Sequence, residues 1–401
     1  MKKRILMLGA SHFQVPAIQY AKSAGHYVVT CDYLPGNPGH KYADECHNVS
    51  TTDQEKILKL ARALKIDGIV AYASDPAAPS AAYVSEQLGL PGNPYRSVLT
   101  LARKDLFRKF LDEHGFATPA SFSCRSLREA RVKLKKLHWP VVVKPVDSSG
   151  SKGVTVAKHD SSFESAFEGA LPFSREKLVI VEEYVDKAGF QIAGDGFVVN
   201  GELVFRLFAN EHFNSTGNVL VPIGESFPSI LEKERQQKVH DEIQRALSIL
   251  GMRTGALNFD IRISHDGHIY LMEIGPRNGG NLIPQATCYA TGFDMVKATV
   301  DAALGLPCTD FGVSPVEGWY ATYIIHSKND GIFKGIEFGP GLESRVLERE
   351  IWALPGDEVK GFDGSNCTLG TMILKFKSQV EMLDYMENMD QHVNVIVESQ
   401  V

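Results

Sequence analysis

The stretch that most constrains this chain is ALNFDIRISHDGHIYLMEIGPRNGG, which occupies residues 256–280. Two apolar-rich runs flank an Asp266-Gly267 pair, and an Asp-Gly pair between such runs is the strongest short-range signal of a β-hairpin. If these two residues form the whole turn, counting outward places Asp260 directly opposite Glu273, with both side chains on one face. The apolar side chains expected on the other face are those of Phe259, Ile261, Ile263, Tyr270, Met272 and Ile274.

Directly opposed carboxylates on neighbouring strands repel each other, so the pair Asp260 and Glu273 indicates a cation between them. A hard divalent cation suits this position, because Mg²⁺ typically binds one or two carboxylates together with substrate phosphates. The hairpin therefore predicts a nucleotide site. The alternative is an edge hairpin that carries two acids by chance on a solvated face, and a turn longer than two residues would change the register.

Composition narrows the class of protein. With 401 residues, 44% of them apolar and 22% charged, the chain suits a globular protein of two or three domains. A net charge of −6 and the lack of a long Lys/Arg run argue against nucleic-acid binding, and no stretch approaches membrane-spanning length. Six cysteines without a C-x-x-C pair are typical of reduced thiols in a cytoplasmic protein, so neither a disulfide framework nor a zinc site is expected.

The first 95 residues are expected to form an α/β domain of their own. The sequence is typical of a βαβ unit: an apolar run at residues 5–8 is followed by a helical pattern, a second apolar run and then Asp32. The segment GASHFQ keeps only the first glycine of G-x-G-x-x-G, which argues against a nicotinamide-dependent oxidoreductase. Asp75 follows another buried strand, at the edge where open α/β sheets place ligand loops.

Two lysines lie in stretches that suit a phosphate group. Lys144 projects from the expected strand PVVVKP, and the next residues, DSSGSKG, form a Gly/Ser loop that carries Lys152. Backbone N–H groups of such a loop can approach phosphate closely while an ammonium neutralises its charge. The loop does not match the P-loop pattern, and an ordinary hairpin loop with one lysine remains the alternative.

Two further stretches have both a functional and a plain structural interpretation. Lys104 lies on the basic face of an expected helix, which by itself indicates a solvated stripe. The apolar run at residues 178–181 leads directly into Glu182-Glu183-Tyr184-Val185. That strand end can present backbone groups to an adenine edge, or it can be an ordinary strand end.

Taken in this order, these parts resemble the ATP-grasp superfamily. The motifs are the helix with Lys104, the strand with Lys144 and its loop, EEYV, Asp260 and MEIGPRNGG, and the likeness spans residues 4–305. The N-terminal segments LMLGAS, AKSAGHYVV, CDYLPGNPG and KYADE look like the pre-ATP-grasp domain of carboxylate–amine ligases. The segment GDEVKGFDGSNCTLG is more loosely similar to the small closing domain of L-amino-acid ligases.

The resemblance implies a multidomain fold of the α/β and α+β classes. A Rossmann-like pre-ATP-grasp domain is expected at residues 1–95, followed at 96–308 by an ATP-grasp domain of two α+β lobes. The nucleotide lid of that domain is expected at residues 115–185, and a small α+β domain at 309–401.

The resemblance also implies roles for individual residues. Those expected to bind ATP are Lys104 and Lys144 at the α- and β-phosphates, Ser148, Ser149, Gly150 and Gly153 in the loop over the β- and γ-phosphates, Glu182, Glu183 and Val185 at the adenine, and Gln191 at the ribose. Those expected to hold Mg²⁺, with Mn²⁺ as an alternative, are Asp260, Glu273 and Asn278. Arg277 and Lys152 are the expected catalytic residues, with Arg277 orienting the γ-phosphate or the acyl phosphate.

Two positions depart from the family pattern. Gln191 stands where the superfamily often has an acid for the ribose hydroxyls, and Gly275 stands where it often has Asn two residues after the metal-binding glutamate. The amide of Gln191 can still bond a hydroxyl group. The loss of the amide at position 275 leaves Asn278 or water to complete the coordination of the metal.

The activity implied is that of an ADP-forming carboxylate–amine ligase that makes a peptide-like bond through an acyl phosphate. The expected substrates are a small carboxylate and an amine, the amine being an amino acid, and His12, Asp75, Arg206 and His212 are candidates for binding them. The alternatives are a relative that phosphorylates bicarbonate or formate and a nucleotide-binding regulatory protein without turnover. A homodimer is expected from the base rate alone.

Overall fold

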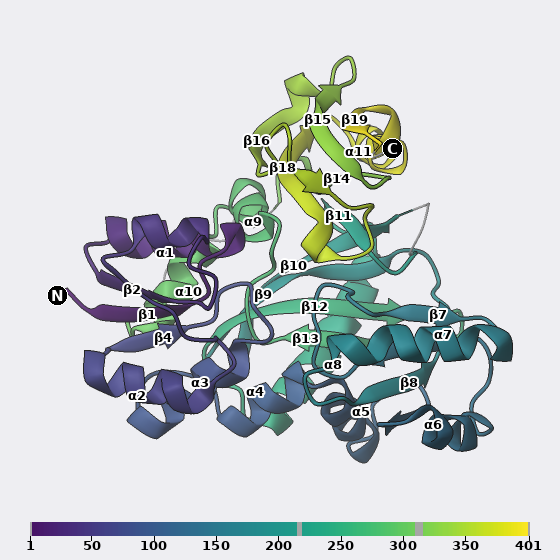
Figure 1. Ribbon diagram of the computed structural model, residues 1–401, viewed down its shortest axis with the longest axis horizontal. Helices are drawn as coiled ribbons and strands as arrows, with labels where there is room; N and C mark the ends of the chain where they lie inside the picture. Colours follow the sequence, from purple (N-terminus) through teal and green to yellow (C-terminus); the bar gives the residue numbers. More distant parts are fainter. Residues whose placement is uncertain (1, 215–218, 309–315, 400–401) are drawn as a thin grey trace.

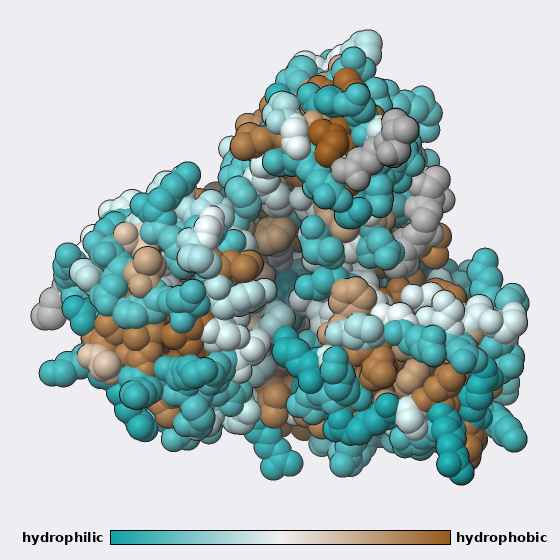
Figure 2. Space-filling view, viewed as in Figure 1, coloured by the Kyte–Doolittle hydropathy of each residue, from teal (hydrophilic) through white to brown (hydrophobic). Residues whose placement is uncertain are grey.

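The computed structural model describes residues 2–214, 219–308 and 316–399. Three lobes surround a central hollow, with the N-terminal lobe on the left, a lid lobe at the lower right and the C-terminal lobe at the top (Figures 1 and 2). The domain boundary expected at residue 309 adjoins residues 309–315, which lie outside the described residues. The multidomain α/β and α+β class expected from the sequence is confirmed.

The N-terminal lobe is built on a parallel sheet of the order β3-β2-β1-β4. Its strands are β1 (Arg4–Leu8), β2 (Tyr27–Cys31), β3 (Glu45–His47) and β4 (Gly68–Val70), and its helices are α1 (Val15–Ser23), α2 (Gln54–Leu64) and α3 (Ala78–Leu88). The strand β1 is buried on both faces, which explains its uninterrupted apolar sequence. Asp75 follows β4 in the loop before α3, at the carboxyl edge of the sheet.

The lid lobe is an antiparallel sheet of the order β5-β8-β6-β7. It contains β5 (Ser121–Cys124), β6 (Val141–Pro145), β7 (Thr155–Ala157) and β8 (Val179–Glu183), covered by α6 (Leu127–Leu134) and α7 (Asp160–Ala170), and it follows α4 (Tyr95–Ala102) and α5 (Lys104–Glu113). Val141 and Val143 pack into the core beneath the helices. Because side chains alternate along a strand, Val142 and Lys144 point to the other side, where they line the central cavity.

A mostly antiparallel sheet of eight strands forms the floor of the molecule, in the order β13-β12-β9-β10-β11-β14-β18-β16. Its strands are β9 (Gln191–Val199), β10 (Glu202–Phe213), β11 (Pro222–Phe227), β12 (Gly255–Ile263), β13 (Ile269–Gly275), β14 (Trp319–His326), β16 (Val346–Ile351) and β18 (Thr368–Phe376). One face packs against α8 (Lys233–Leu250) and α5. On the other face, α9 (Ile283–Thr291) and α10 (Met295–Ala303) connect the sheet to the N-terminal lobe.

The C-terminal segment contributes to this sheet as well as to a lobe of its own. Strands β14, β16 and β18 extend the central sheet beyond β11, so the segment is continuous with the sheet that carries the hairpin of β12 and β13. The remaining small sheet has the order β17-β15-β19 and is accompanied by one helix. These elements are β15 (Gly331–Phe338), β17 (Glu358–Val359), β19 (Val393–Glu398) and α11 (Gln379–Glu387).

The hairpin of β12 and β13 differs from the expected one in its turn. The Ser264 N–H donates to the His268 carbonyl at 3.0 Å, and Gly267 has a φ of +86°, so the turn has three residues instead of two. A bulge at Met272 compensates for this shift, and Asp260 still lies directly opposite Glu273. The expected pairing is therefore present although the expected turn was wrong.

The bulge also changes which side chains of β13 face the core. Leu271 is buried in the core cluster beside Phe259, whereas Met272 lines the central cavity and Tyr270 is only half-buried. The apolar face expected from strict alternation is thus wrong at Tyr270 and Met272. The physical reason is that one extra residue inverts the alternation of every side chain between the bulge and the turn.

Candidate active site

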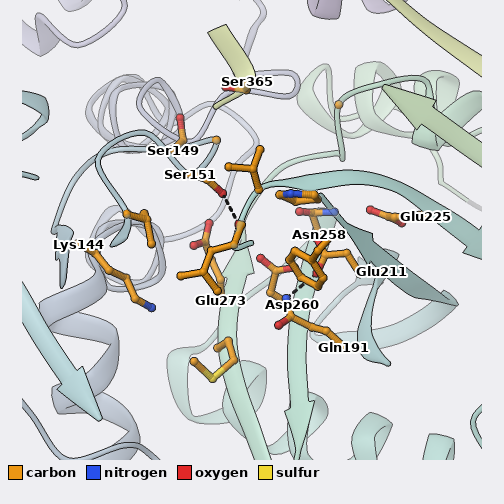
Figure 3. Close-up of a pocket in the computed structure, with 18 of the residues that line it drawn as sticks. Lys144, Ser149, Ser151, Gln191, Glu211, Glu225, Asn258, Asp260, Glu273 and Ser365 are labelled. Carbon is orange, nitrogen blue, oxygen red and sulfur yellow. Dashed lines mark hydrogen bonds between the residues drawn. The ribbon is translucent and has the colours of Figure 1, made fainter. Parts of the chain in front are cut away.

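A cavity of about 240 Å³ lies between the lid lobe, the central sheet and the C-terminal strands (Figure 3). Most of the residues expected to bind the nucleotide or the metal line it. They are Lys104, Lys144, Ser148, Ser149, Gly150, Glu182, Glu183, Val185, Gln191, Asp260, Glu273 and Arg277. Lys152, Gly153 and Asn278 do not line it, and neither do the candidate substrate residues His12, Asp75, Arg206 and His212.

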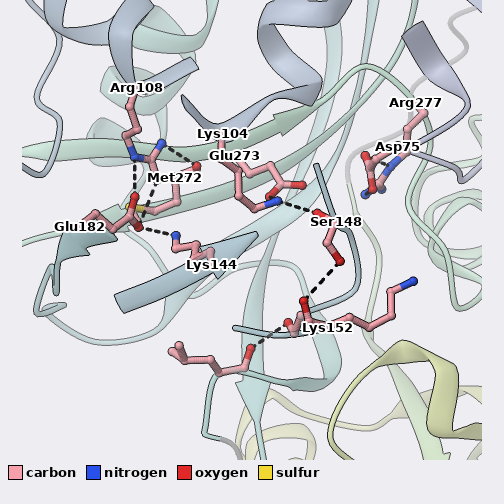
Figure 4. Close-up of polar contacts among 12 residues, drawn as sticks. Asp75, Lys104, Arg108, Lys144, Ser148, Lys152, Glu182, Met272, Glu273 and Arg277 are labelled. Carbon is pink, nitrogen blue, oxygen red and sulfur yellow. Dashed lines mark hydrogen bonds and ion pairs between the residues drawn. The ribbon is translucent and has the colours of Figure 1, made fainter. Parts of the chain in front are cut away.

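The paired carboxylates of the hairpin form the floor of this cavity. Burial and the negative charge of Glu273 raise the pKa of Asp260 to about 6. The Lys104 Nζ lies 3.6 Å from a carboxylate oxygen of Glu273 and donates to the Ser148 carbonyl at 2.7 Å (Figure 4). The repulsion within the pair and its hard oxygen donors fit Mg²⁺. In the part of the chain that the structure describes, no group of three or more His, Cys, Asp or Glu side chains could hold a metal ion.

Two asparagines are candidates for the third protein ligand of the metal, beside Asp260 and Glu273. Asn278 is fully buried, neither atom of its amide has a hydrogen-bond partner, and it lies outside the cavity lining. Asn258 lies directly opposite Gly275 on β12 and lines the cavity. Its Nδ2 donates to Asp195 Oδ1 at 2.9 Å and to the Gly194 carbonyl at 3.2 Å, which leaves its oxygen free of these bonds. Sequence reasoning missed Asn258, although its register opposite Gly275 was available.

Glu182 lies in a buried ion network and does not present its side chain to a ligand. Its carboxylate accepts a bond from Arg108 Nε at 2.9 Å and pairs with Lys144 (Figure 4). Burial opposes its ionisation, but the charges of Arg108 and Lys144 outweigh burial and hold the pKa of Glu182 at about 2. Burial, opposed by Glu182, lowers the pKa of Lys144 to about 8. Glu182 therefore positions Lys144.

The segment after Glu182 lines the cavity at Glu183 and Val185. The Glu183 carboxylate accepts bonds from the backbone N–H of His138 at 2.8 Å and from its ring at 2.9 Å. The Val185 carbonyl accepts from Arg262 Nη1 at 3.0 Å. Because the carboxylates of both acids are engaged elsewhere, an adenine at this strand end would meet main-chain groups and the Val185 side chain.

The Gly/Ser loop is closed against the C-terminal segment. Gly150 has a φ of +64°, and its carbonyl accepts from the Ser365 N–H at 3.0 Å. A Cβ at Gly150 would lie 1.9 Å from Ser365 Oγ, so this contact requires glycine. Lys152 lies within this loop but does not line the cavity; burial and the nearby Arg175 lower its pKa.

Arg277 binds a residue of the N-terminal lobe. Its Nε and Nη2 each lie 2.7 Å from an oxygen of Asp75, and its Nη1 donates to the Asn278 carbonyl at 3.0 Å (Figure 4). Burial disfavours a charged Asp75, but the guanidinium outweighs burial and lowers the pKa of that carboxyl group. Asp75, a candidate for substrate binding, thus reaches the active site through Arg277.

The other candidate substrate residues lie elsewhere. His12 stacks on Trp352 with ring centroids 4.7 Å apart, at the junction of the N-terminal and C-terminal lobes. Arg206 bonds to Gln237 of α8, on the face of the central sheet opposite the cavity. His212 bonds to Ser226 Oγ at 2.9 Å, and burial lowers its pKa to about 4. None of these three side chains is brought into the cavity.

Comparison with known proteins agrees with this geometry. The ATP-grasp domain family matches residues 137–285, which include the lid strands, the Gly/Ser loop and the paired carboxylates. Residues 137–285 of this chain therefore match an ATP-grasp domain.

Curated relatives of this chain include formate-dependent phosphoribosylglycinamide formyltransferases. The enzyme of Burkholderia pseudomallei (strain 668) is 26% identical over 380 residues, which cover 90% of this chain and 86% of the relative. That of Bacteroides fragilis is 24% identical over 312 residues, covering 76% of this chain and 78% of the relative.

Solved structures share the whole fold. The L-amino acid ligase from Bacillus licheniformis superposes with a TM-score of 0.82 at 22% identity, covering 99% of both chains. The phosphoribosylglycinamide synthetase from Anaerococcus prevotii has a TM-score of 0.76 at 22% identity and covers 99% of this chain and 100% of its own.

These matches agree with the expectation of an ATP-dependent, ADP-forming ligase that uses Mg²⁺ and acts on small molecules of the carboxylate and amine classes. None of the helices in the described residues is long and apolar enough to cross a membrane.

Proposed function

We propose that this protein activates a small carboxylate as an acyl phosphate and transfers the acyl group to the amino group of an amino acid. The observation that carries the proposal is the convergence of Asp260 and Glu273 with Lys104 beneath the Gly/Ser loop, in one cavity. In phosphoryl transfer the protein contributes mostly position and charge neutralisation, and this arrangement supplies both.

Asp260, Glu273 and Asn258 are the residues we assign to the metal. Asn258 takes the place of the earlier candidate Asn278, because its amide oxygen is on the cavity face while Asn278 lies outside the cavity lining. A metal held by these residues would neutralise charge on the phosphate oxygens while the γ-phosphoryl group passes from ATP to an oxygen of the substrate carboxylate, leaving ADP. Lys104, which contacts both Glu273 and the loop carbonyl of Ser148, holds the loop in register with this acidic pair.

Lys144 and the Gly/Ser loop are assigned to the phosphates. Lys144 is half-buried on the cavity face of β6 and held by Glu182, so its ammonium has a fixed position. Ser148, Ser149, Gly150 and Gly153 belong to the loop that would cover the β- and γ-phosphates, and the bond between Ser365 and Gly150 closes it. A closed loop of this kind excludes water from the acyl phosphate. Gln191 is assigned to the ribose, and Val185 to the adenine.

Arg277 is assigned to the oxyanion of the tetrahedral intermediate. The neighbouring Gly279 N–H is already engaged by the two oxygens of Asp195, at 3.0 and 2.9 Å, so it is not available as a donor. Arg277 keeps its position through Asp75 and lines the cavity beside Glu273. A fixed cation at this point stabilises negative charge as it develops. Lys152, outside the cavity, is left without a catalytic assignment.

An amino acid suits the acceptor side better than a phosphorylated amine. A small hollow adjoins the cavity at Gly280 and Asn281, where the N-terminal and C-terminal lobes meet. Its walls include His12, Tyr72 and Trp352, and none of the described residues that line it is Lys or Arg. A phosphate group is normally bound by such cations, and Glu350 also lines this hollow, so it favours a substrate without a phosphate group.

The second candidate function is the phosphorylation of formate or bicarbonate. It is supported by the curated relatives, which are named as formate-dependent enzymes. It differs from the first candidate in that formate or bicarbonate alone would stimulate release of ADP, without an amino acid.

The experiment is a screen for ADP release with pairs of small carboxylates and amino acids, followed by mass spectrometry of the products. Stimulation by one pair, with an amide as product, is the expected result. Stimulation by formate or bicarbonate alone would select the second candidate, and no stimulation by any combination would contradict both.

A further inference from the structure

The cavity contains a second pair of opposed acids that the nucleotide does not explain. Glu211 on β10 lies directly opposite Glu225 on β11, in a row that continues from Gln191 on β9 to Thr322 on β14. All four side chains line the cavity, and Figure 3 shows Glu211 near Asp260, with Glu225 farther to the right. Like charges in directly opposed positions are destabilising, so this pair also requires something positive nearby.

The two acids differ in what already binds them. A Glu211 oxygen accepts from Gln191 Nε2 at 2.5 Å, and Gln191 in turn accepts from Arg262 at 2.6 Å. The Oε2 of Glu225 has no hydrogen-bond partner, although the residue is only 8% exposed. Glu225 is therefore the member of the pair whose oxygen is left for a ligand. An unsatisfied buried carboxylate oxygen is costly, so its retention requires a role.

A second unpartnered oxygen lines the same cavity. It is the Oδ1 of Asn281, in the loop that follows Arg277. The backbone carbonyl of Asn281 accepts from Thr371 Oγ1 of β18, which places this loop over the C-terminal strands next to β11. Among the fully buried side-chain oxygens of the described residues that line the cavity, these two are the ones without a hydrogen-bond partner, and both are acceptors.

Two acceptors of this kind, one of them a carboxylate, are complementary to a cation that donates hydrogen bonds. A primary ammonium group has a single positive charge and three donors. A second divalent metal suits the position less well, because the Glu211 carboxylate is already engaged by Gln191. We propose that Glu225 and Asn281 form the subsite for the ammonium group of the amine substrate.

This subsite deepens the proposed function and rests on it. It lies on the side of the cavity toward the C-terminal strands, and Asn281 also lines the small hollow with His12 and Trp352. Burial and the charges of Asp195 and Asp260 raise the pKa of Glu225 well above its ordinary value. A bound ammonium offsets both effects and lets the carboxylate ionise.

Hydroxylamine separates the subsite from the chemistry. It is largely uncharged at neutral pH and traps acyl phosphates as hydroxamates, so it does not need an ammonium subsite. The Glu225→Gln variant is expected to form hydroxamate from the carboxylate found in the screen at the parental rate. The same variant is expected to show a KM for the amino acid raised about tenfold or more, the effect of losing a hydrogen bond to a charged group.

Matched variants make the comparison specific. Glu202→Gln changes an exposed acid at the start of β10, outside the cavity. This variant should change neither hydroxamate formation nor the KM for the amino acid. Asn281→Leu should raise the KM for the amino acid above that of the parent protein. Asn281→Asp should have a KM equal to that of the parent or lower. MgADP binding by calorimetry should be the same in all of these variants.

The contrary outcomes are distinct. An unchanged KM for the amino acid in Glu225→Gln, with hydroxamate formation intact, would overturn the subsite and leave the proposed function standing. Weaker MgADP binding, or the loss of a bound Mn²⁺ ion from the nucleotide complex, would assign Glu225 to the nucleotide or metal instead and overturn the subsite as well. Failure of the parent protein to form hydroxamate with any carboxylate would overturn the proposed function, and the subsite with it.

Discussion

Arg277 and Asp75 form a bidentate ion pair, with both N–O distances at 2.7 Å, between the loop after β13 and the N-terminal lobe. Both side chains are largely buried, so each charge depends on the other for compensation. The pair fixes the guanidinium beside the cavity and ties the first lobe to the active site. The position of the lobe and the position of the Arg277 guanidinium are thereby coupled.

The first prediction concerns this pair. Asp75→Asn leaves Arg277 buried without its counter-charge, and the free energy of unfolding should fall by about 2 to 4 kcal/mol. Urea unfolding measures the change. The double variant Asp75→Asn/Arg277→Gln should lose less than the sum of the two single losses, since the two residues act as a unit. Strict additivity would contradict the coupling.

The second prediction concerns Lys144. Burial lowers its pKa to about 8, so its ammonium loses its proton as the pH rises through that value in the free protein. The affinity for MgADP should be constant below about pH 8 and weaken above it. Calorimetry between pH 6.5 and 9.5 measures this. Lys144→Met should bind more weakly throughout and lack the decline, and identical pH profiles for the parent and this variant would contradict the assignment.

The third prediction concerns His212 and stability. Its pKa is 6.5 in an unfolded chain and is lowered to about 4 by burial, so below pH 6.5 the unfolded chain binds a proton that the folded protein does not. The contribution to stability is complete above pH 6.5 and is lost as the pH falls toward 4, up to about 3 kcal/mol. Unfolding of the parent and of His212→Asn between pH 7.5 and 4.5 measures it, and the variant should have the shallower dependence. Equal slopes would rule out this role.

The fourth prediction distinguishes the two asparagines. Asn258→Ala should weaken Mn²⁺ binding in the presence of ADP by about tenfold or more, because it removes an oxygen from the metal-facing side of β12. Asn278→Ala should leave this affinity unchanged. Electron paramagnetic resonance of Mn²⁺ measures both without any need for turnover. The reverse pattern would return the role to Asn278.

Some of the site could be predicted from the sequence because its signals are local. Asp260 and Glu273 belong to one hairpin, so counting along a few residues was enough to pair them, even though the longer turn and the bulge at Met272 each shift the register by one. Neither shift can be seen in an alternation pattern. Asn258 was within reach of the same counting, since it lies opposite Gly275.

Other parts depend on contacts between distant segments. Glu225 is placed opposite Glu211 and Thr322 only when β11 pairs with β10 on one side and with β14 on the other. The strand β14 begins far along the chain, so this placement cannot be read from the local sequence. Glu182 was expected at the adenine, but Arg108 from α5 and Lys144 from β6 surround its carboxylate. Ser365 closes the Gly/Ser loop from the C-terminal segment, which showed no chemical pattern of its own. Such pairings are set by tertiary packing and leave no local trace.

The most direct test of the central claim is ATP turnover, with the screened substrates, by Asp260→Ala and Glu273→Ala. Because the metal supplies several kcal/mol of charge stabilisation, each variant should lose about a hundredfold or more in turnover while remaining folded. Undiminished turnover in both variants would show that these opposed carboxylates do not hold the metal, and would contradict the account.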